Sequence, residues 1–335
     1  MKTGAVLLML ASCLLAAAAP VPQMPDPDLV PVNPELRQAA RGILQAQRKK
    51  FTYTQPKPGP LPGGVTERQV PGSRGQPPVT VYVVDGAPKA SSPRGAIFFI
   101  HGGGFIGGDA RENLSQLKSL AARQDCVIVT VQYRLAPATR FPGPVEDAYA
   151  ALKWLHANAA SLGVDPSRLV VMGESAGGGL AAMLTIAARD RGEVPVAFQA
   201  LVYPMLDDRT GSSRPVPPHI GRLLWTPESN RKGWQALLGR APGAANQPAG
   251  AVPARVTNLK GLPPTFIGVG SIDLFAEEDI DFARRLVNAG VPTELLVVPG
   301  AFHGFQMIAP KASVSQQFNA TLEAALSRAL SPEKK

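Results

Sequence analysis

The chain has 335 residues, of which 45% are hydrophobic and 18% charged, and its formal net charge is +9. This amount of apolar surface supports a sizeable core and excludes disorder throughout the chain. The basic residues are dispersed and accompany no zinc-finger or RNA-binding signature, so a nucleic-acid partner is not expected. With only Cys13 and Cys126, neither a disulfide framework nor a cysteine-based metal site is expected in the mature protein.

Residues 1–19 are predicted to be an export signal. A lysine near the start is followed by an uncharged, alanine-rich stretch that is short for a membrane-spanning helix. Residues 10–13 also resemble a bacterial lipoprotein box, in which the leader would end at Ser12 and Cys13 would carry a lipid. In either case we expect an exported protein, periplasmic or secreted, with membrane attachment only if Cys13 is lipidated.

Residues 20–64 combine proline-rich spacers with one predicted helix. Pro34 suits the first position of a helix, and apolar residues at helical spacing predict a helix over 35–48. Residues 55–64 contain four prolines and three glycines and are predicted to be a linker.

From residue 65 to 335, apolar strand-like runs alternate with helical patterns, which predicts one α/β domain with a mostly parallel central sheet and helices on both faces. Residues 207–262 hold two tryptophans and many prolines but no clear strand, and we expect a lid at the carboxyl ends of the strands; a plain surface excursion is the alternative. The predicted strands are 79–84, 96–100, 127–132, 169–172, 198–203, 265–270 and 293–298, and the predicted helices are 111–124, 145–160, 176–189, 277–289 and 314–330.

The segment 173–177, GESAG, matches the G-x-S-x-G nucleophile elbow, in which a serine occupies a tight turn between a strand and a helix. A predicted strand comes directly before it and a predicted helix directly after it. This context indicates that Ser175 is a nucleophile. A glycine-rich strand–helix connection without chemistry is the alternative.

The segment 101–104, HGGG, follows another predicted strand. Glycines allow backbone N–H groups to turn toward a developing oxyanion, as acyl transfer requires. His101 is expected to order this loop rather than to act as a base. The same stretch fits G-x-G-x-x-G, but the next strand ends without the carboxylate that a dinucleotide site needs, so no nucleotide cofactor is expected.

Enzymes with a nucleophile elbow carry Ser, then Asp or Glu, then His, each on a loop after a strand. Among the histidines only His303 meets this condition, and it is the expected base. Asp273 directly follows the predicted strand 265–270 and is the expected acid, although it could also cap the next helix. The poorer candidates for the acid are Asp207, Asp208, Asp279 and Asp281.

Taken together, these residues resemble the hormone-sensitive-lipase-like (bacterial family IV) α/β-hydrolases of the acetyl-esterase type. The resemblance implies an α/β-hydrolase fold with Ser175 as nucleophile, His303 as general base and acid, and Asp273 as its orienting partner. It runs from about residue 79 to 305 and rests on 101–105 (HGGGF), 133–137 (YRLAP), 173–178 (GESAGG), 273–274 (DL) and 303–305 (HGF).

The resemblance also implies an oxyanion hole formed by the backbone N–H groups of Gly103, Gly104 and Ala176. A cap would be formed by the N-terminal helix together with parts of 207–262. Two departures from the family pattern stand out. Glu174 replaces the aspartate of many relatives, which we expect to affect packing more than activity, and Leu-Phe rather than Pro-Leu follows the predicted acid.

We therefore expect a serine carboxylic-ester hydrolase that acts through an acyl-enzyme on short- to medium-chain acyl esters, without a metal or an organic cofactor. Phe105, Trp225 and Phe305 are expected to line the pocket for this small-molecule ester. The alternatives are an amidase or lactonase, or a deacetylase of small acylated molecules. A non-catalytic ligand-binding homologue ranks last, because the three reactive groups are all present.

Overall fold

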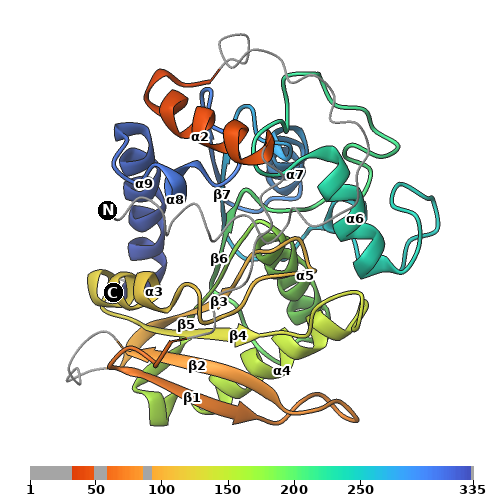
Figure 1. Ribbon diagram of the computed structural model, residues 1–335. Helices are drawn as coiled ribbons and strands as arrows, with labels where there is room; N and C mark the ends of the chain where they lie inside the picture. The colour runs from red at the N-terminus through yellow and green to blue at the C-terminus, as the bar shows by residue number, and fades with distance from the viewer. Residues whose placement is uncertain (1–31, 49–58, 86–92, 333–335) are drawn as a thin grey trace.

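The computed structural model describes residues 32–48, 59–85 and 93–332 (Figure 1). The predicted export signal, Cys13 and the first part of the predicted linker, residues 55–58, lie outside these residues. Within the described part of the chain, no helix is both long enough and apolar enough to cross a membrane.

One eight-stranded sheet organises the molecule, in the order β1-β2-β4-β3-β5-β6-β7-β8. The six strands β4-β3-β5-β6-β7-β8 run parallel to one another. At the other edge, β1 pairs antiparallel with β2, and β2 pairs antiparallel with β4. The prediction of a mostly parallel sheet is confirmed. The strands are β1 (Val65–Val70), β2 (Val79–Asp85), β3 (Arg94–Ile100), β4 (Val127–Gln132), β5 (Val164–Glu174), β6 (Phe198–Val202), β7 (Thr265–Gly270) and β8 (Thr293–Val298).

Helices cover both faces of this sheet, and two hydrophobic clusters fill the space between them. Along β3, alternate side chains enter opposite clusters. Phe98 belongs to the cluster that contains residues of α4 and α5, whereas Phe99 belongs to the cluster that contains residues of α3 and α9. The helices are α2 (Arg37–Arg48), α3 (Leu114–Gln124), α4 (Gly143–Ala157), α5 (Ala176–Arg191), α6 (Pro227–Leu238), α7 (Ala276–Asn288), α8 (Phe305–Ile308) and α9 (Ser313–Leu330), with short 3-10 turns at Pro34–Leu36, Ala160–Leu162 and Pro253–Arg255.

The predicted helix over 35–48 begins as the 3-10 turn Pro34–Leu36 and continues as α2. The Asn33 side chain accepts a hydrogen bond from the N–H of Glu35 (3.0 Å), which caps this start. The buried face of α2 belongs to the same cluster as Leu223 and Leu224 from the segment 207–262. This places α2 over the end of the sheet where the loops after β7 and β8 lie (Figure 1).

The segment 207–262 joins β6 to β7 and is irregular apart from α6 and the turn Pro253–Arg255. The sequence analysis did not predict α6. Its start carries ordinary signals, because Thr226 Oγ1 accepts from the N–H of Ser229 (3.2 Å) and Pro227 occupies the first helical position. Gly239 ends the helix in the left-handed region, with φ 68°.

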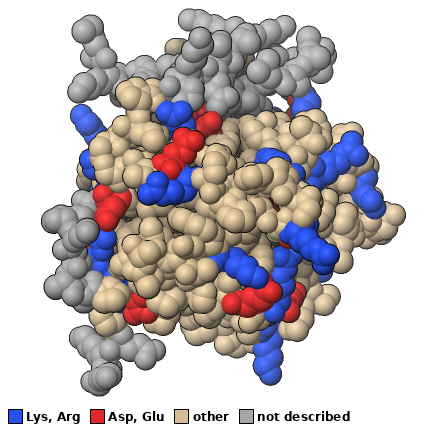
Figure 2. Space-filling view, turned by 90° about the horizontal axis from the view of Figure 1, so that it is seen from below, with Lys and Arg blue, Asp and Glu red and all other residues tan. Residues whose placement is uncertain are grey.

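The surface shows no gathering of positive charge on the face drawn in Figure 2. There, Lys and Arg are interspersed with Asp and Glu. Ion pairs of surface side chains include that of Arg123 with Glu323 (2.8 Å).

Candidate active site

Ser175 lies in the one-residue turn between β5 and α5, with φ 56° and ψ −123°. This is an uncommon conformation for a residue with a side chain, and the surrounding backbone holds it. The N–H of Ser175 donates to the carbonyl of Val202 on β6 (2.9 Å). A Cβ atom at Gly177 would lie 2.2 Å from the carbonyl oxygen of Ile100, so only glycine allows the start of α5 to pass this close to β3.

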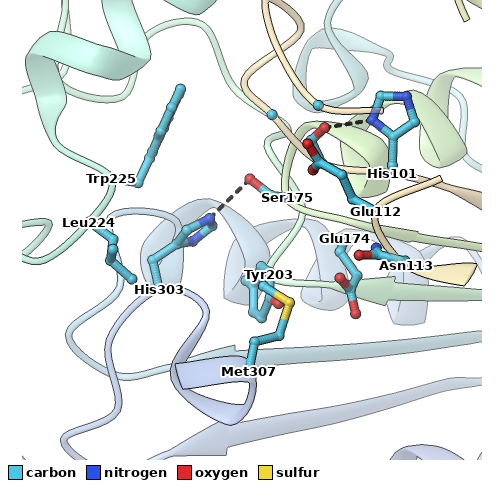
Figure 3. A pocket seen from close by; sticks show the side chains of 13 residues that line it. His101, Glu112, Asn113, Glu174, Ser175, Tyr203, Leu224, Trp225, His303 and Met307 are labelled. Atoms are coloured by element: carbon cyan, nitrogen blue, oxygen red, sulfur yellow. Dashed lines mark hydrogen bonds between the residues drawn. The ribbon is translucent and has the colours of Figure 1, made fainter. Parts of the chain in front are cut away.

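His303 and Asp273 come from the loops after β8 and β7. Figure 3 shows His303 beside Ser175. His303 Nε2 lies 2.9 Å from Ser175 Oγ, and His303 Nδ1 lies 2.8 Å from Asp273 Oδ2. A carboxylate only accepts hydrogen bonds, so Nδ1 carries the proton and Nε2 is left to accept from the serine hydroxyl. The three side chains therefore form a continuous chain of hydrogen bonds.

The Asp273 carboxyl is itself held in place. Its Oδ1 accepts from the N–H of Phe275 (3.0 Å), and only 1% of the residue is exposed. The family pattern has a proline directly after the acid, whereas this chain has Leu274. The contact that holds Asp273 comes from the backbone N–H of Phe275, so it does not depend on that proline.

Three aromatic rings surround the imidazole of His303. Tyr203, which follows β6, packs against it edge-on with ring centroids 4.7 Å apart, and Phe275 does the same at 5.3 Å. Trp225 from the segment 207–262 lies at 6.4 Å. The sequence analysis missed Tyr203 and Phe275 as neighbours of the imidazole. Their positions directly after strands were the available signal, because such loops meet at one end of a parallel sheet.

His101 lies in the glycine loop after β3. Its ring stacks on Tyr133, with centroids 4.3 Å apart, and its Nδ1 lies 2.8 Å from the carbonyl oxygen of Gly102. The Tyr133 hydroxyl donates to the His101 carbonyl (3.1 Å). Burial lowers the pKa of His101 to about 4, so the ring is neutral at pH 7 and orders the loop.

The backbone of the same loop turns through the left-handed region at Gly103 (φ 117°) and Gly104 (φ 63°). A Cβ atom on Gly104 would lie 2.2 Å from the Trp225 ring, so this position requires glycine. Ala176 is the first residue of α5, where a helix has no internal partner for the N–H. Within the described residues, the N–H groups of Gly103, Gly104 and Ala176 have no hydrogen-bond acceptor.

A pocket of about 70 Å³ opens at Ser175. Of the three aromatic residues expected to line it, Trp225 does so. Phe105 and Phe305 do not: Phe105 packs against Trp234 in the core (ring centroids 5.1 Å apart) and Phe305 against Phe318 (5.2 Å). Both are fully buried, so that expectation was wrong for these two. The lining is His101, Gly102, Gly103, Gly108, Glu112, Asn113, Glu174, Ser175, Tyr203, Leu224, Trp225, His303 and Met307.

Glu174, which was expected to affect packing more than activity, lines the pocket. Burial raises the pKa of its carboxyl to about 7, an effect that the nearby charge of His303 opposes. The described residues contain no group of three or more His, Cys, Asp or Glu side chains that could hold a metal ion.

Comparison with known proteins agrees with this fold. A family model for the alpha/beta hydrolase fold matches residues 97–307. Carboxylesterase NlhH of Mycobacterium tuberculosis is 32% identical over 325 residues, which cover 92% of this chain and 98% of NlhH. Esterase LipI of the same organism is 34% identical over 221 residues, covering 65% of this chain and 67% of LipI.

Among solved structures, a bacterial heroin esterase superposes with a TM-score of 0.75 at 36% identity, covering 97% of this chain and 99% of that one. The esterase LipW from Mycobacterium marinum gives a TM-score of 0.75 at 33% identity, over 92% and 99%. The resemblance seen in the sequence motifs is confirmed: the chain belongs to the alpha/beta hydrolase family, within its hormone-sensitive-lipase-like group of esterases.

Proposed function

We propose that this protein is a serine carboxylesterase that forms an acyl-enzyme on Ser175. The observation that carries the proposal is the chain of two hydrogen bonds, 2.8 and 2.9 Å long, that joins Asp273 to His303 and His303 to the Ser175 hydroxyl. Hydrogen bonds from nucleophile to base and from base to an orienting carboxylate are what nucleophilic catalysis by a serine requires.

In the first half of the reaction, Ser175 Oγ attacks the ester carbonyl and its proton passes to His303 Nε2. Asp273 stabilises the imidazolium that forms. The N–H groups of Gly103, Gly104 and Ala176 stabilise the negative charge on the carbonyl oxygen, and their lack of another acceptor makes them available for this. His303 then donates the proton to the departing alcohol oxygen.

In the second half, water takes the place of the alcohol. The water oxygen attacks the acyl carbon while His303 Nε2 removes a proton from the water. The same N–H groups stabilise the second oxyanion. Return of the proton to Ser175 Oγ releases the carboxylic acid. Every proton in the cycle moves through one nitrogen atom.

The size of the pocket supports short- to medium-chain acyl groups as substrates. A cavity of about 70 Å³ has space for a small number of heavy atoms. Leu224 and Trp225 close one side of it, and both come from the segment 207–262. We propose that this segment and α2 act together as a cap, which is supported by the shared hydrophobic cluster of α2 with Leu224.

The test is hydrolysis of p-nitrophenyl esters of increasing acyl length by the leaderless protein and its Ser175→Ala variant. We expect turnover to be greatest for short chains and to fall by roughly 10⁴-fold or more in Ser175→Ala. Thermal melting of both proteins controls for folding. Turnover that survives in a folded Ser175→Ala protein, or none in either protein, would refute the proposal.

We further propose that residues 1–19 direct export. Support comes from the short uncharged stretch and the alanines that end it. Cell fractionation of the full-length protein tests this, and a chain without the leader should remain in the cytoplasm. Comparison with Cys13→Ser separates plain export from lipid attachment, because only a lipidated protein would lose its membrane fraction.

A further inference from the structure

The pocket has two chemically different sides (Figure 3). Trp225 and Leu224 lie on one side of Ser175, beside His303. Glu174, Glu112 and Asn113 lie on the other side. An ester bound at Ser175 therefore extends one part toward apolar side chains and the other toward carboxyl groups.

No lysine or arginine is among the residues that line this pocket, although the whole chain has a net charge of +9. His101 is neutral at pH 7, and burial raises the pKa of Tyr203 well above its ordinary value, so neither contributes charge there. The titratable groups that face the pocket are His101 after β3, Glu112 before α3, Glu174 at the end of β5, Tyr203 after β6 and His303 after β8, with Asp273 behind His303.

The backbone of Glu174 is fixed in position by the sheet. Glu174 is the residue before Ser175, and its backbone pairs with Val202 of β6. Among the described residues, its carboxyl makes no hydrogen bond and no ion pair. A partly buried carboxylate that has no counter-ion is stabilised when a cation binds beside it.

We propose that Glu174 is a specificity-determining residue that selects esters whose alcohol portion carries a positive charge, such as a substituted ammonium group. The apolar side at Leu224 and Trp225 then takes the acyl chain. This inference rests on the proposed esterase function, and it names the substrate class that the site distinguishes.

The preference depends on pH in a defined direction. With a pKa of about 7, the Glu174 carboxyl is mostly neutral below pH 7 and mostly charged above it. Only the charged form attracts a cation. The preference for a cationic ester therefore increases as the pH rises through about 7, and the bound cation in turn favours loss of the proton.

The experiment compares acetylcholine with 3,3-dimethylbutyl acetate, its neutral isostere in which carbon replaces nitrogen. The ratio of their kcat/KM values is measured from about pH 6 to about pH 8.5. We expect a ratio of roughly ten at high pH that falls toward low pH. In Glu174→Gln the ratio should be several-fold lower at high pH and independent of pH. The ratio cancels any change in the amount of folded enzyme.

Glu67→Gln serves as the matched control, because it removes one negative charge from the exposed surface of β1, outside the pocket. It should keep the ratio and the pH dependence of the parent protein. A ratio near one at every pH in the parent protein, or a ratio that Glu174→Gln leaves unchanged, would overturn this inference while hydrolysis of the neutral ester upholds the esterase. Failure to hydrolyse any ester would overturn both.

Discussion

The loops that carry the reactive groups and the segment 207–262 that lies beside them are built in different ways. Ser175, Asp273 and His303 each follow a parallel strand, so the hydrogen bonds of the sheet fix the backbone that leads to them. The segment 207–262 contains no strand and forms only one isolated bridge, between Thr210 and Arg214.

Charged side chains hold that segment instead. Asp208 is fully buried and accepts from Arg255 Nε (2.7 Å), from the N–H of Gly243 (2.7 Å) and from Gln247 Nε2 (2.8 Å). Beside it, Glu278 on α7 accepts from the N–H of Leu206 (2.7 Å). The sheet therefore positions the reactive groups, whereas polar side-chain contacts hold the segment that supplies Leu224 and Trp225 to the pocket.

The largest effect should come from a change within the sheet-held group. Asp273→Asn presents an amide to His303 and favours the wrong imidazole tautomer, so kcat should fall roughly 10⁴-fold. Steady-state kinetics measure the loss, and circular dichroism checks that the fold is kept. A loss below tenfold in a folded protein would show that Asp273 does not orient the base.

Next in size is a change in the segment 207–262. Asp208→Asn leaves Arg255 without its counter-ion in a largely buried place, and the free energy of unfolding should fall by about 3 kcal/mol. Urea denaturation measures it. The matched control is Asp190→Asn, which breaks the exposed pair with Arg189 and should cost less than about 1 kcal/mol. Equal losses in the two variants would contradict the role assigned to Asp208.

A third change acts where the two regions meet. Gly104→Ala places a methyl group against the Trp225 ring and displaces an N–H that faces the oxyanion, so kcat should fall roughly 10²-fold to 10³-fold. Gly42→Ala on α2 is the control, because its Cβ meets no atom within 4 Å. An unchanged kcat in Gly104→Ala would show that the N–H of Gly104 does not contribute to the proposed oxyanion hole.

The smallest effect concerns stability. Asp279 on α7 is fully buried, and both its carboxyl oxygens lack a partner among the described residues. Burial, with Glu278 and Asp273 nearby, raises its pKa well above the ordinary value. The folded state therefore keeps a proton that the unfolded state loses at neutral pH, and this costs stability as the pH rises above the ordinary pKa.

Asp279→Asn removes that cost. The variant should be more stable than the parent protein by about 1 kcal/mol at pH 7, and the difference should shrink toward pH 4, where unfolded Asp279 is partly protonated. Urea denaturation at both pH values measures this. A difference that is the same at both pH values would show that protonation of Asp279 does not contribute.

The sequence predicts the sheet best where strands are buried on both faces. The bounds of β4 and β7 match their predicted ranges, because short apolar runs between turn residues leave little choice. The bounds of β8 also match, although only its last residue is buried. β1 was missed, since only Val65 and Val70 of its six residues are buried and the polar residues between them give an edge strand no apolar signal. α6 was missed because prolines and a glycine in and around it weaken the helical pattern.

At the site, chain order and motif context predicted which groups meet, because loops after parallel strands converge. The pocket lining was harder to predict. Phe105 stands directly beside the glycine loop, yet its backbone has φ 68° and turns the ring into the core. Glu174 stands beside Ser175 and its side chain does reach the pocket. Side-chain direction in a tight turn depends on dihedral angles, which a residue pattern does not contain.

The order of the strands also has a consequence for biosynthesis. Ser175 emerges from the ribosome with β5, but His303 is 128 positions later and follows β8, the last strand of the sheet. While the chain is being made, the hydroxyl stays inert, because the group that removes its proton has not been synthesised. When β8 joins the sheet, it also brings His303 to Ser175. A chain truncated before β8 therefore contains the serine but lacks the base, and we expect it to be inactive.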